Sequence, residues 1–219
     1  MNYRMMRAGL ALIGLVVVSG CGMTTTTAER FARDIEFAHG AGSWRAHEAL
    51  SADIVVTFMG GTMLEGRMTF TTDMSRARIE TTAGPVMVFD GERAWLSPAS
   101  AEVEMARFHL LTWPYFVAAP YKLQDPGSHL SYLGTMPLDD SGTEYDVAEL
   151  TFDAGVGDTP DDWYVCYRDL ATGRLYSMAY IITYYQDTAK ANAEPHAITY
   201  HDFENLRGAM ISTTWKFWH

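Results

Sequence analysis

Apolar and polar side chains alternate from Ala52 onward, and this period of two restricts the fold more than any other feature of the chain. In the segment LEGRMTF, Leu64, Met68 and Phe70 fall on one face of an extended chain, and polar residues fall on the other. The segments RARIETT and VMVFD then lead to Asp90-Gly91, a dipeptide typical of hairpin turns. The pattern predicts an antiparallel meander of strands with one apolar face.

An amphipathic helix is predicted before these strands. In AERFARDIEFAH, residues 28–39, the apolar residues Phe31, Ile35 and Ala38 recur at helical spacing, and Gly40 ends the pattern. We expect this helix to lie with its apolar side on an apolar surface.

Residues 101–123, AEVEMARFHLLTWPYFVAAPYKL, are more apolar than a helix exposed to water should be. Pro114 and Pro120 interrupt the segment. We therefore predict one or two short helices that cover the sheet. The next stretch, residues 124–143, contains Pro126-Gly127 and is predicted to be a loop.

The second half of the chain returns to strands. Residues 174–185, RLYSMAYIITYY, are largely apolar on both faces, so this long strand should be central and covered. A polar linker is predicted from Gln186 to Glu194. The other predicted strands are YDVAELTF, WYVCYRD, HAITYHDF and AMISTTWKFWH, with the acidic loop DAGVGDTPDD after the first of them.

The first 20 residues, MNYRMMRAGLALIGLVVVSG, have the features of a secretory signal. Arg4 and Arg7 precede an apolar run, residues 8–18, and the small residues Ser19 and Gly20 follow it. The apolar run is shorter than the roughly 20 residues that a helix needs to cross a membrane. We predict a signal over residues 1–20 rather than a permanent helical anchor.

The tetrapeptide Val18-Ser19-Gly20-Cys21 resembles the lipobox of bacterial lipoproteins. The resemblance implies cleavage before Cys21 and acylation of its thiol, so that residues 21–27 tether the domain to a membrane. Because Gly22 and not Asp follows the cysteine, we expect an outer-membrane lipoprotein that faces the periplasm, with the inner membrane and the cell surface as alternatives. An ordinary signal with an incidental cysteine is the other interpretation.

Charge and cysteine content limit the partners of the chain. The predicted signal contains two of the 16 basic residues and no acidic residue. The chain without the signal therefore has a more negative net charge than the formal −11 of the whole sequence. Because such a chain repels phosphate groups, we expect neither nucleic acid nor direct adsorption to anionic headgroups. The second cysteine, Cys166, lies in a strand-like segment and is predicted to be a buried, unreactive thiol. If Cys21 is acylated, the chain has no disulfide.

The order of these parts resembles the Lol superfamily of lipoprotein carriers, which includes a periplasmic chaperone, an outer-membrane receptor and mycobacterial lipid carriers. The matching parts are the amphipathic helix ending in GAGSW, the segment VFDGERAW, the apolar insert after it, and the ending YHDFENLRGAMISTTW. The resemblance implies an α+β, mostly β fold, in which a curved antiparallel sheet forms an open half barrel with helices as a lid. It also implies a single domain over residues 28–219 and a non-enzymatic function, the binding of lipid or of lipoprotein acyl chains.

A half barrel with an apolar concave face can hold acyl chains, and each enclosed methylene contributes about 0.8 kcal/mol. A structural or interaction lipoprotein, in which the same faces meet in a closed core, is the first alternative. The predicted ligand-binding residues are the large apolar side chains of the meander and the insert: Phe58, Met68, Phe70, Met87, Phe89, Trp95, Phe108, Leu111, Trp113 and Phe116.

A hydrolase or metal-dependent enzyme is the second alternative. The sequence contains no nucleophile elbow, phosphate loop or zinc helix motif. His196 and His201 are separated by an odd number of positions, which places them on opposite faces of one strand. We therefore predict no catalytic residue, no metal site and no cofactor.

The acidic loop carries four carboxylates of the kind that calcium prefers: Asp153, Asp158, Asp161 and Asp162. Their spacing lacks the alternating order of a calcium-binding hand, and Pro160 stiffens the loop. A solvated hairpin loop is the prediction, with calcium binding as the alternative.

Overall fold

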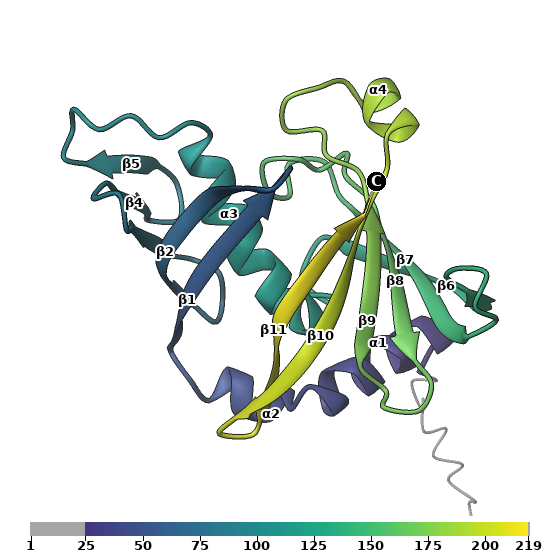
Figure 1. Cartoon of the computed structure of the whole chain (residues 1–219). Coiled ribbons are helices and arrows are strands. Elements are labelled where there is room, and N and C mark those ends of the chain that lie inside the picture. Colours follow the sequence, from purple (N-terminus) through teal and green to yellow (C-terminus); the bar gives the residue numbers. More distant parts are fainter. Residues whose placement is uncertain (1–24, 219) are drawn as a thin grey trace, which may run out of the picture.

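Two open antiparallel sheets make up most of the protein, for which a computed structural model describes residues 25–218 (Figure 1). The first sheet has the order β1-β2-β3-β4-β5, and its strands are Ala49–Phe58, Gly61–Thr71, Ala77–Thr81, Val86–Phe89 and Ala94–Ser97. The second has the order β11-β10-β9-β8-β7-β6, and its strands, in chain order from β6, are Ser128–Pro137, Glu144–Phe152, Tyr164–Asp169, Leu175–Tyr180, His196–Leu206 and Ala209–Trp218. The helices are α1 (Thr27–Ala38), α2 (Ala41–Arg45), α3 (Ala106–Ala118), the 3-10 turn η1 (Ala119–Tyr121) and α4 (Thr188–Ala193).

The predicted fold class is confirmed, because the protein is mostly β, its strands are antiparallel, and neither sheet closes into a barrel. The hydrogen-bonded strands form two sheets rather than one continuous sheet, and α3 and η1 connect β5 to β6. Figure 1 shows α3 crossing behind the first sheet, while α1 and α2 run along the lower end of the second.

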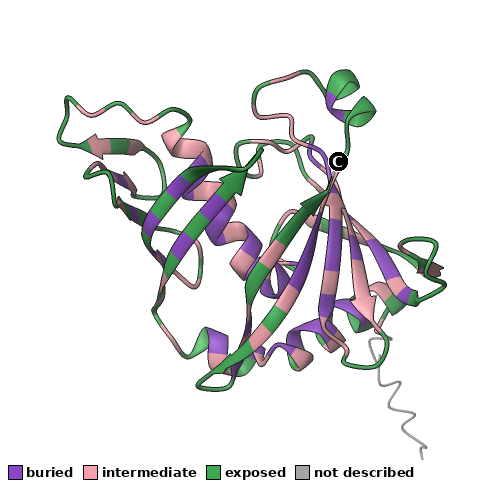
Figure 2. Cartoon of the chain, viewed as in Figure 1, coloured by how far each residue is buried: buried purple, intermediate pink, exposed green. Residues whose placement is uncertain are grey.

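The inner face of the first sheet packs against α3. Met68 on β2 lies opposite Ile79 on β3, which lies opposite Met87 on β4, and all three are buried. One position away, Arg67 and Glu80 oppose each other on the outer face and are exposed. Figure 2 shows this alternation of buried and exposed positions along β1 and β2. The period of two in the sequence thus corresponds to a sheet with one covered face.

Helix α1 begins at a capping box and ends beside the second sheet. The Thr26 side chain accepts a hydrogen bond from the Glu29 backbone N–H, and the Glu29 carboxylate accepts one from the Thr26 N–H. Phe31 and Ile35 are buried where the helix contacts β6, β7 and η1. The predicted amphipathic helix is therefore confirmed.

The apolar insert forms one α-helix, α3, followed by η1. Pro114 lies inside α3 without ending it, whereas Pro120 falls in the first positions of η1. The helix covers β3, β4 and β5, as the prediction of helices over the sheet required.

Three segments differ from their predicted structure. Residues 124–143 were expected to form a loop but contain β6, whose period breaks at a bulge between Tyr132 and Gly134. Residues 186–194 contain α4 rather than only a linker, because the Asp187 side chain caps its first turn. The predicted strand over residues 174–185 ends at Tyr180.

The predicted signal over residues 1–20 and the lipidation site Cys21 lie outside the described residues, as does most of the predicted tether. Within residues 25–218, no helix has the length and apolar character needed to span a membrane.

Candidate functional site

A cavity of about 1080 Å³ lies between α3, the paired ends of β1 and β2, and the inner face of the second sheet. Its lining is largely apolar and is rich in aromatic side chains from both sheets. The volume lies just above the range of about 300–1,000 Å³ that is usual for small-molecule sites.

The structure places the predicted ligand-binding residues in two groups. Six of them line the cavity: Phe58, Phe89, Phe108, Leu111, Trp113 and Phe116. The other four, Met68, Phe70, Met87 and Trp95, do not belong to the lining.

The four residues outside the lining have two different positions. Met68, Phe70 and Met87 are buried in the core that includes α3. Trp95 is 46% exposed and pairs with Val88, one position away from the inner-face pair of Met87 and Leu96. Because successive strand residues point to opposite faces, Trp95 lies on the outer face of the first sheet.

Apolar side chains also form the open rim of the cavity. Phe58 and Met63, at the ends of β1 and β2, are 52% and 47% exposed, and Met105 and Tyr185 are 36% and 58% exposed. These exposed lining residues mark where the cavity meets solvent.

Arg107 on α3 connects the two sides of the cavity. Its Nη2 atom donates to Asp158 Oδ1 at 2.8 Å, and its Nε atom donates to the other carboxylate oxygen. Its Nη1 atom donates to the Glu92 carbonyl oxygen at 2.9 Å, and its guanidinium lies 5.0 Å from the centre of the Phe89 ring. The guanidinium thus joins α3 and the β4–β5 turn to the acidic loop between β7 and β8.

Two further polar groups of the lining have internal partners. Asp162 Oδ1 accepts hydrogen bonds of 2.8 Å from the backbone N–H and the hydroxyl of Thr183, and burial raises the pKa of this carboxyl. The Trp113 indole N–H donates to His109 Nδ1 at 3.0 Å, and burial lowers the pKa of that histidine. The Thr183 bond lies beyond the end of β9, where the strand predicted to reach residue 185 has already stopped.

Three tyrosines of the lining were not predicted as site residues. Tyr115 on α3, Tyr164 on β8 and Tyr180 on β9 lie next to one another, with ring centres 5.5 and 5.9 Å apart. Tyr180 could have been found, because the alternation in RLYSMAYIITYY puts it on the same face as Met178.

The acidic loop does not gather its carboxylates around one point. Asp158 is paired with Arg107, Asp162 with Thr183, and Asp153 with His129. In the described part of the chain, no group of three or more His, Cys, Asp or Glu side chains is arranged to hold a metal ion.

The two histidines singled out in the sequence are apart in the structure. His196 lines the cavity beside Tyr180, whereas His201 Nε2 lies 2.9 Å from the Thr199 hydroxyl. Cys166 is fully buried, and burial raises the pKa of its thiol to about 12, so the thiolate is strongly disfavoured at neutral pH.

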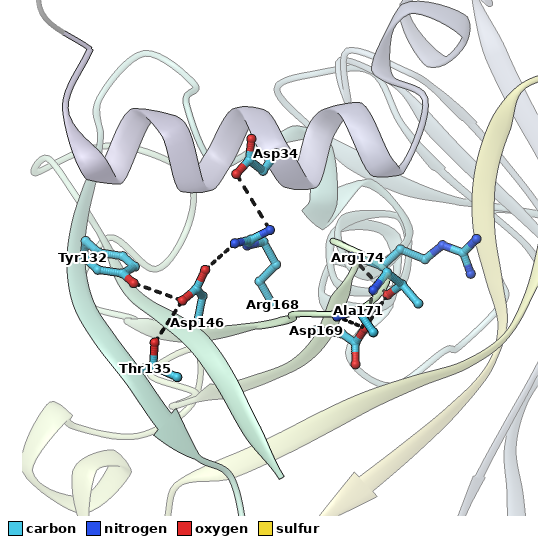
Figure 3. A network of polar contacts seen from close by, with 9 residues as sticks. Asp34, Tyr132, Thr135, Asp146, Arg168, Asp169, Ala171 and Arg174 are labelled. Atoms are coloured by element: carbon cyan, nitrogen blue, oxygen red, sulfur yellow. Dashed lines mark hydrogen bonds and ion pairs between the residues drawn. The ribbon is translucent and has the colours of Figure 1, made fainter.

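A polar network outside the cavity joins α1 to the second sheet (Figure 3). Asp146 on β7 accepts hydrogen bonds from Tyr132 at 3.0 Å and Thr135 at 3.1 Å, and it pairs with Arg168 on β8. Arg168 also lies 3.7 Å from a carboxylate oxygen of Asp34 on α1. The network positions α1 and does not contribute to the lining.

Comparisons with known proteins bear on the fold. No protein-family model matches the chain, and a search of curated proteins finds no match. The chain is similar to the crystal structure of a LolA superfamily protein from Nitrosomonas europaea, with a TM-score of 0.56 and 12% identity over 88% of this chain and 86% of that chain. A provisionally named outer membrane lipoprotein-sorting protein domain from Vibrio parahaemolyticus has a TM-score of 0.49 and 14% identity, over 85% and 82% of the two chains. The chain therefore has the fold of a LolA superfamily protein.

Proposed function

We propose that this protein binds an apolar ligand, a lipid or the acyl part of a lipoprotein, in the cavity between its two sheets. The observation that carries the proposal is the cavity itself, because a volume of about 1080 Å³ with an apolar lining and an apolar open rim is suited to an alkyl chain. A structural lipoprotein with a closed core would leave no such volume. The fold agrees with the resemblance of the sequence to lipoprotein carriers.

The hydrophobic effect is large enough for this function. Enclosing about ten methylenes of an acyl chain contributes about 8 kcal/mol before the entropic costs of binding. Since a micromolar dissociation constant corresponds to about 8 kcal/mol after those costs, a ligand bound with micromolar affinity must enclose more than about ten methylenes.

A non-enzymatic function is part of the proposal. Arg107 and Asp158 neutralise each other, and the Asp162 carboxylate is held by Thr183. Catalysis by a side chain needs a nucleophile or base within reach of the reacting atoms, and these paired groups are already occupied.

Co-purified lipid tests the binding function. We expect native mass spectrometry of the full chain carrying Cys21→Ala, purified from bacterial lysate without detergent, to show lipid adducts. A Leu111→Trp variant, which fills part of the cavity, should lose most of them. Identical adducts on both chains, or no adducts and no uptake of an added acyl probe, would contradict the proposal.

We also propose that acylated Cys21 anchors the domain to a bacterial membrane, with the outer membrane and the periplasmic side favoured. Replacing Cys21 by Ala should move the chain from the membrane fraction to the soluble fraction. The matched control, Cys166→Ala, alters the other cysteine and should leave the chain with the membrane. A Cys21→Ala chain that stays with the membrane would refute the anchor.

A further inference from the structure

Five tyrosines line the cavity, and none of their hydroxyls has a hydrogen-bond partner among residues 25–218. Three of these hydroxyls sit on rings that contact one another. They belong to Tyr115, Tyr164 and Tyr180, whose rings form a contiguous cluster. By contrast the Tyr200 hydroxyl, also deep in the protein, donates to the Phe116 carbonyl oxygen at 3.2 Å. Water can partner these hydroxyls when no ligand is bound, since they are not among the fully enclosed side-chain atoms that lack a partner. A ligand that excludes this water must itself supply a partner, because a hydroxyl left buried without one is unfavourable by about 1–3 kcal/mol.

These hydroxyls can donate to a ligand. Burial raises the pKa of each tyrosine above the ordinary value, so the hydroxyl proton is retained at physiological pH. None of the three hydroxyl oxygens belongs to the fully enclosed side-chain atoms that lack a partner, so each keeps some accessible surface. Because all three residues line the cavity, a bound molecule can reach that surface.

The charges of the lining favour a neutral ligand. Among the described residues, the single guanidinium in the lining is that of Arg107, and it is already paired with Asp158. Asp162 and Glu104 add two more carboxyl groups, and no further Arg or Lys side chain of residues 25–218 lines the cavity. A carboxylate or phosphate on the ligand would meet negative charge in a cavity of low polarity, where like charges repel strongly.

We propose that the tyrosine cluster of Tyr115, Tyr164 and Tyr180 donates hydrogen bonds to the carbonyl oxygens of a neutral acyl ester. The cavity would then select esterified acyl chains over free fatty acids, while the apolar lining holds the alkyl part. This inference rests on the proposed function, since it specifies the ligand class of the same cavity.

A set of ligands with the same chain length tests the inference. Methyl laurate, laurate and dodecane would each displace the apolar fluorescent dye N-phenyl-1-naphthylamine from the full chain carrying Cys21→Ala at pH 8. We expect laurate to bind at least about tenfold more weakly than methyl laurate. Because one carbonyl oxygen accepts at most two hydrogen bonds, we expect one or two of the variants Tyr115→Phe, Tyr164→Phe and Tyr180→Phe to weaken methyl laurate by about 3- to 10-fold. All three variants should leave dodecane within twofold.

Tyr167→Phe is the matched control, because Tyr167 lies on the same strand as Tyr164 but on the opposite face. It should bind all three ligands as the unsubstituted chain does. Dilauroylglycerol and the same diacylglyceryl group on a cysteine peptide then separate a free lipid from a lipoprotein as the source of the ester, and tighter binding of either fits the inference.

Two outcomes overturn the inference and leave the proposed function standing: laurate binding as tightly as methyl laurate, or the three tyrosine variants binding methyl laurate as tightly as the unsubstituted chain. If neither dodecane nor any ester displaces the dye, the proposed function and the inference both fail.

Discussion

His39, directly after helix α1, joins this helix to strands β9 and β11. Its Nδ1 atom donates to the Met210 carbonyl oxygen at 3.0 Å, and its Nε2 atom accepts from the Leu175 backbone N–H at 3.1 Å. Only the neutral ring can make both bonds, because the protonated ring has no acceptor. Burial, and to a lesser extent the nearby Arg174, lower the pKa of His39 to about 4.

We predict that folding stability falls as His39 becomes protonated in the unfolded chain. The pKa of the ring is about 6.5 when unfolded and about 4 when folded, so the unfolded state binds more protons between these values. The stabilising contribution is complete above pH 6.5 and is lost as the pH falls to 4, by about 3 kcal/mol.

Urea unfolding between pH 7 and pH 4 measures this loss against a His39→Gln chain. The variant should be less stable at pH 7 and should show a smaller decrease in stability over the same range, while other titrating groups affect both chains alike. Equal pH dependence in the two chains would show that His39 does not titrate as described.

Asp146 and Asp34 both pair with Arg168, and their burial predicts different effects of mutation. The Asp146 side chain is 15% exposed and that of Asp34 is 47% exposed. Asp146→Ala leaves a mostly buried guanidinium without its main partner, and we expect it to lower the free energy of unfolding by about 3 kcal/mol. Asp34→Ala removes a partly exposed ion pair and should cost less than about 1 kcal/mol. Chemical denaturation of the two variants tests this difference, and equal losses would argue against a buried role for Asp146.

At the scale of elements, the junction between α1 and α2 closes tightly onto the turn between β10 and β11. Gly40 has a φ of +72°, and a Cβ placed there would lie 1.9 Å from the Gly208 carbonyl oxygen. The adjacent Met210 N–H donates to the His39 carbonyl oxygen at 2.9 Å. The helical segment and the hairpin therefore approach with no room for a side chain.

We predict opposite effects for alanine at the two glycines of this segment. Gly40→Ala should lower the free energy of unfolding by about 2 kcal/mol or more, because the backbone at Gly208 must move and alanine is strained at positive φ. Gly42 lies inside α2, and a Cβ added there would meet no neighbouring atom within 4 Å, so Gly42→Ala should raise stability by about 0.5–1 kcal/mol. Thermal unfolding compares the pair, and a similar change in both would contradict the close contact.

The elements that could be predicted from the sequence are those specified by neighbouring residues. Helix α1 has its capping box and apolar spacing within one short segment, and the first meander has regular alternation with a hairpin signal. Strand β6 was missed because its bulge breaks the period. The end of β9 at Tyr180 was missed because it depends on the neighbouring strands, which begin at Tyr164 and His196 opposite it and pair with no later residue.

At the scale of the whole molecule, the sequence predicts the fold class but only some of the residues that line the cavity. The predicted residues on α3 line the cavity, because helical spacing and apolar content were enough to identify the insert as a cover. Trp95 falls on the outer face, since the register of the β4–β5 hairpin pairs Phe89 with Ala94 and shifts Trp95 by one position. The division into two sheets, and the meeting of Tyr115 with Tyr164, depend on tertiary packing that local patterns do not contain.

The central claim, that the cavity binds an acyl ligand, is tested most directly by titrating N-phenyl-1-naphthylamine into the full chain carrying Cys21→Ala. The fluorescence should rise to saturation, and added acyl ester should reverse it. Leu111→Trp, inside the cavity, should weaken dye binding by about tenfold or more, whereas Val55→Trp, at a site 61% exposed on the outer face, should leave it unchanged. Unsaturable binding, or equal affinity in both variants, would contradict the claim.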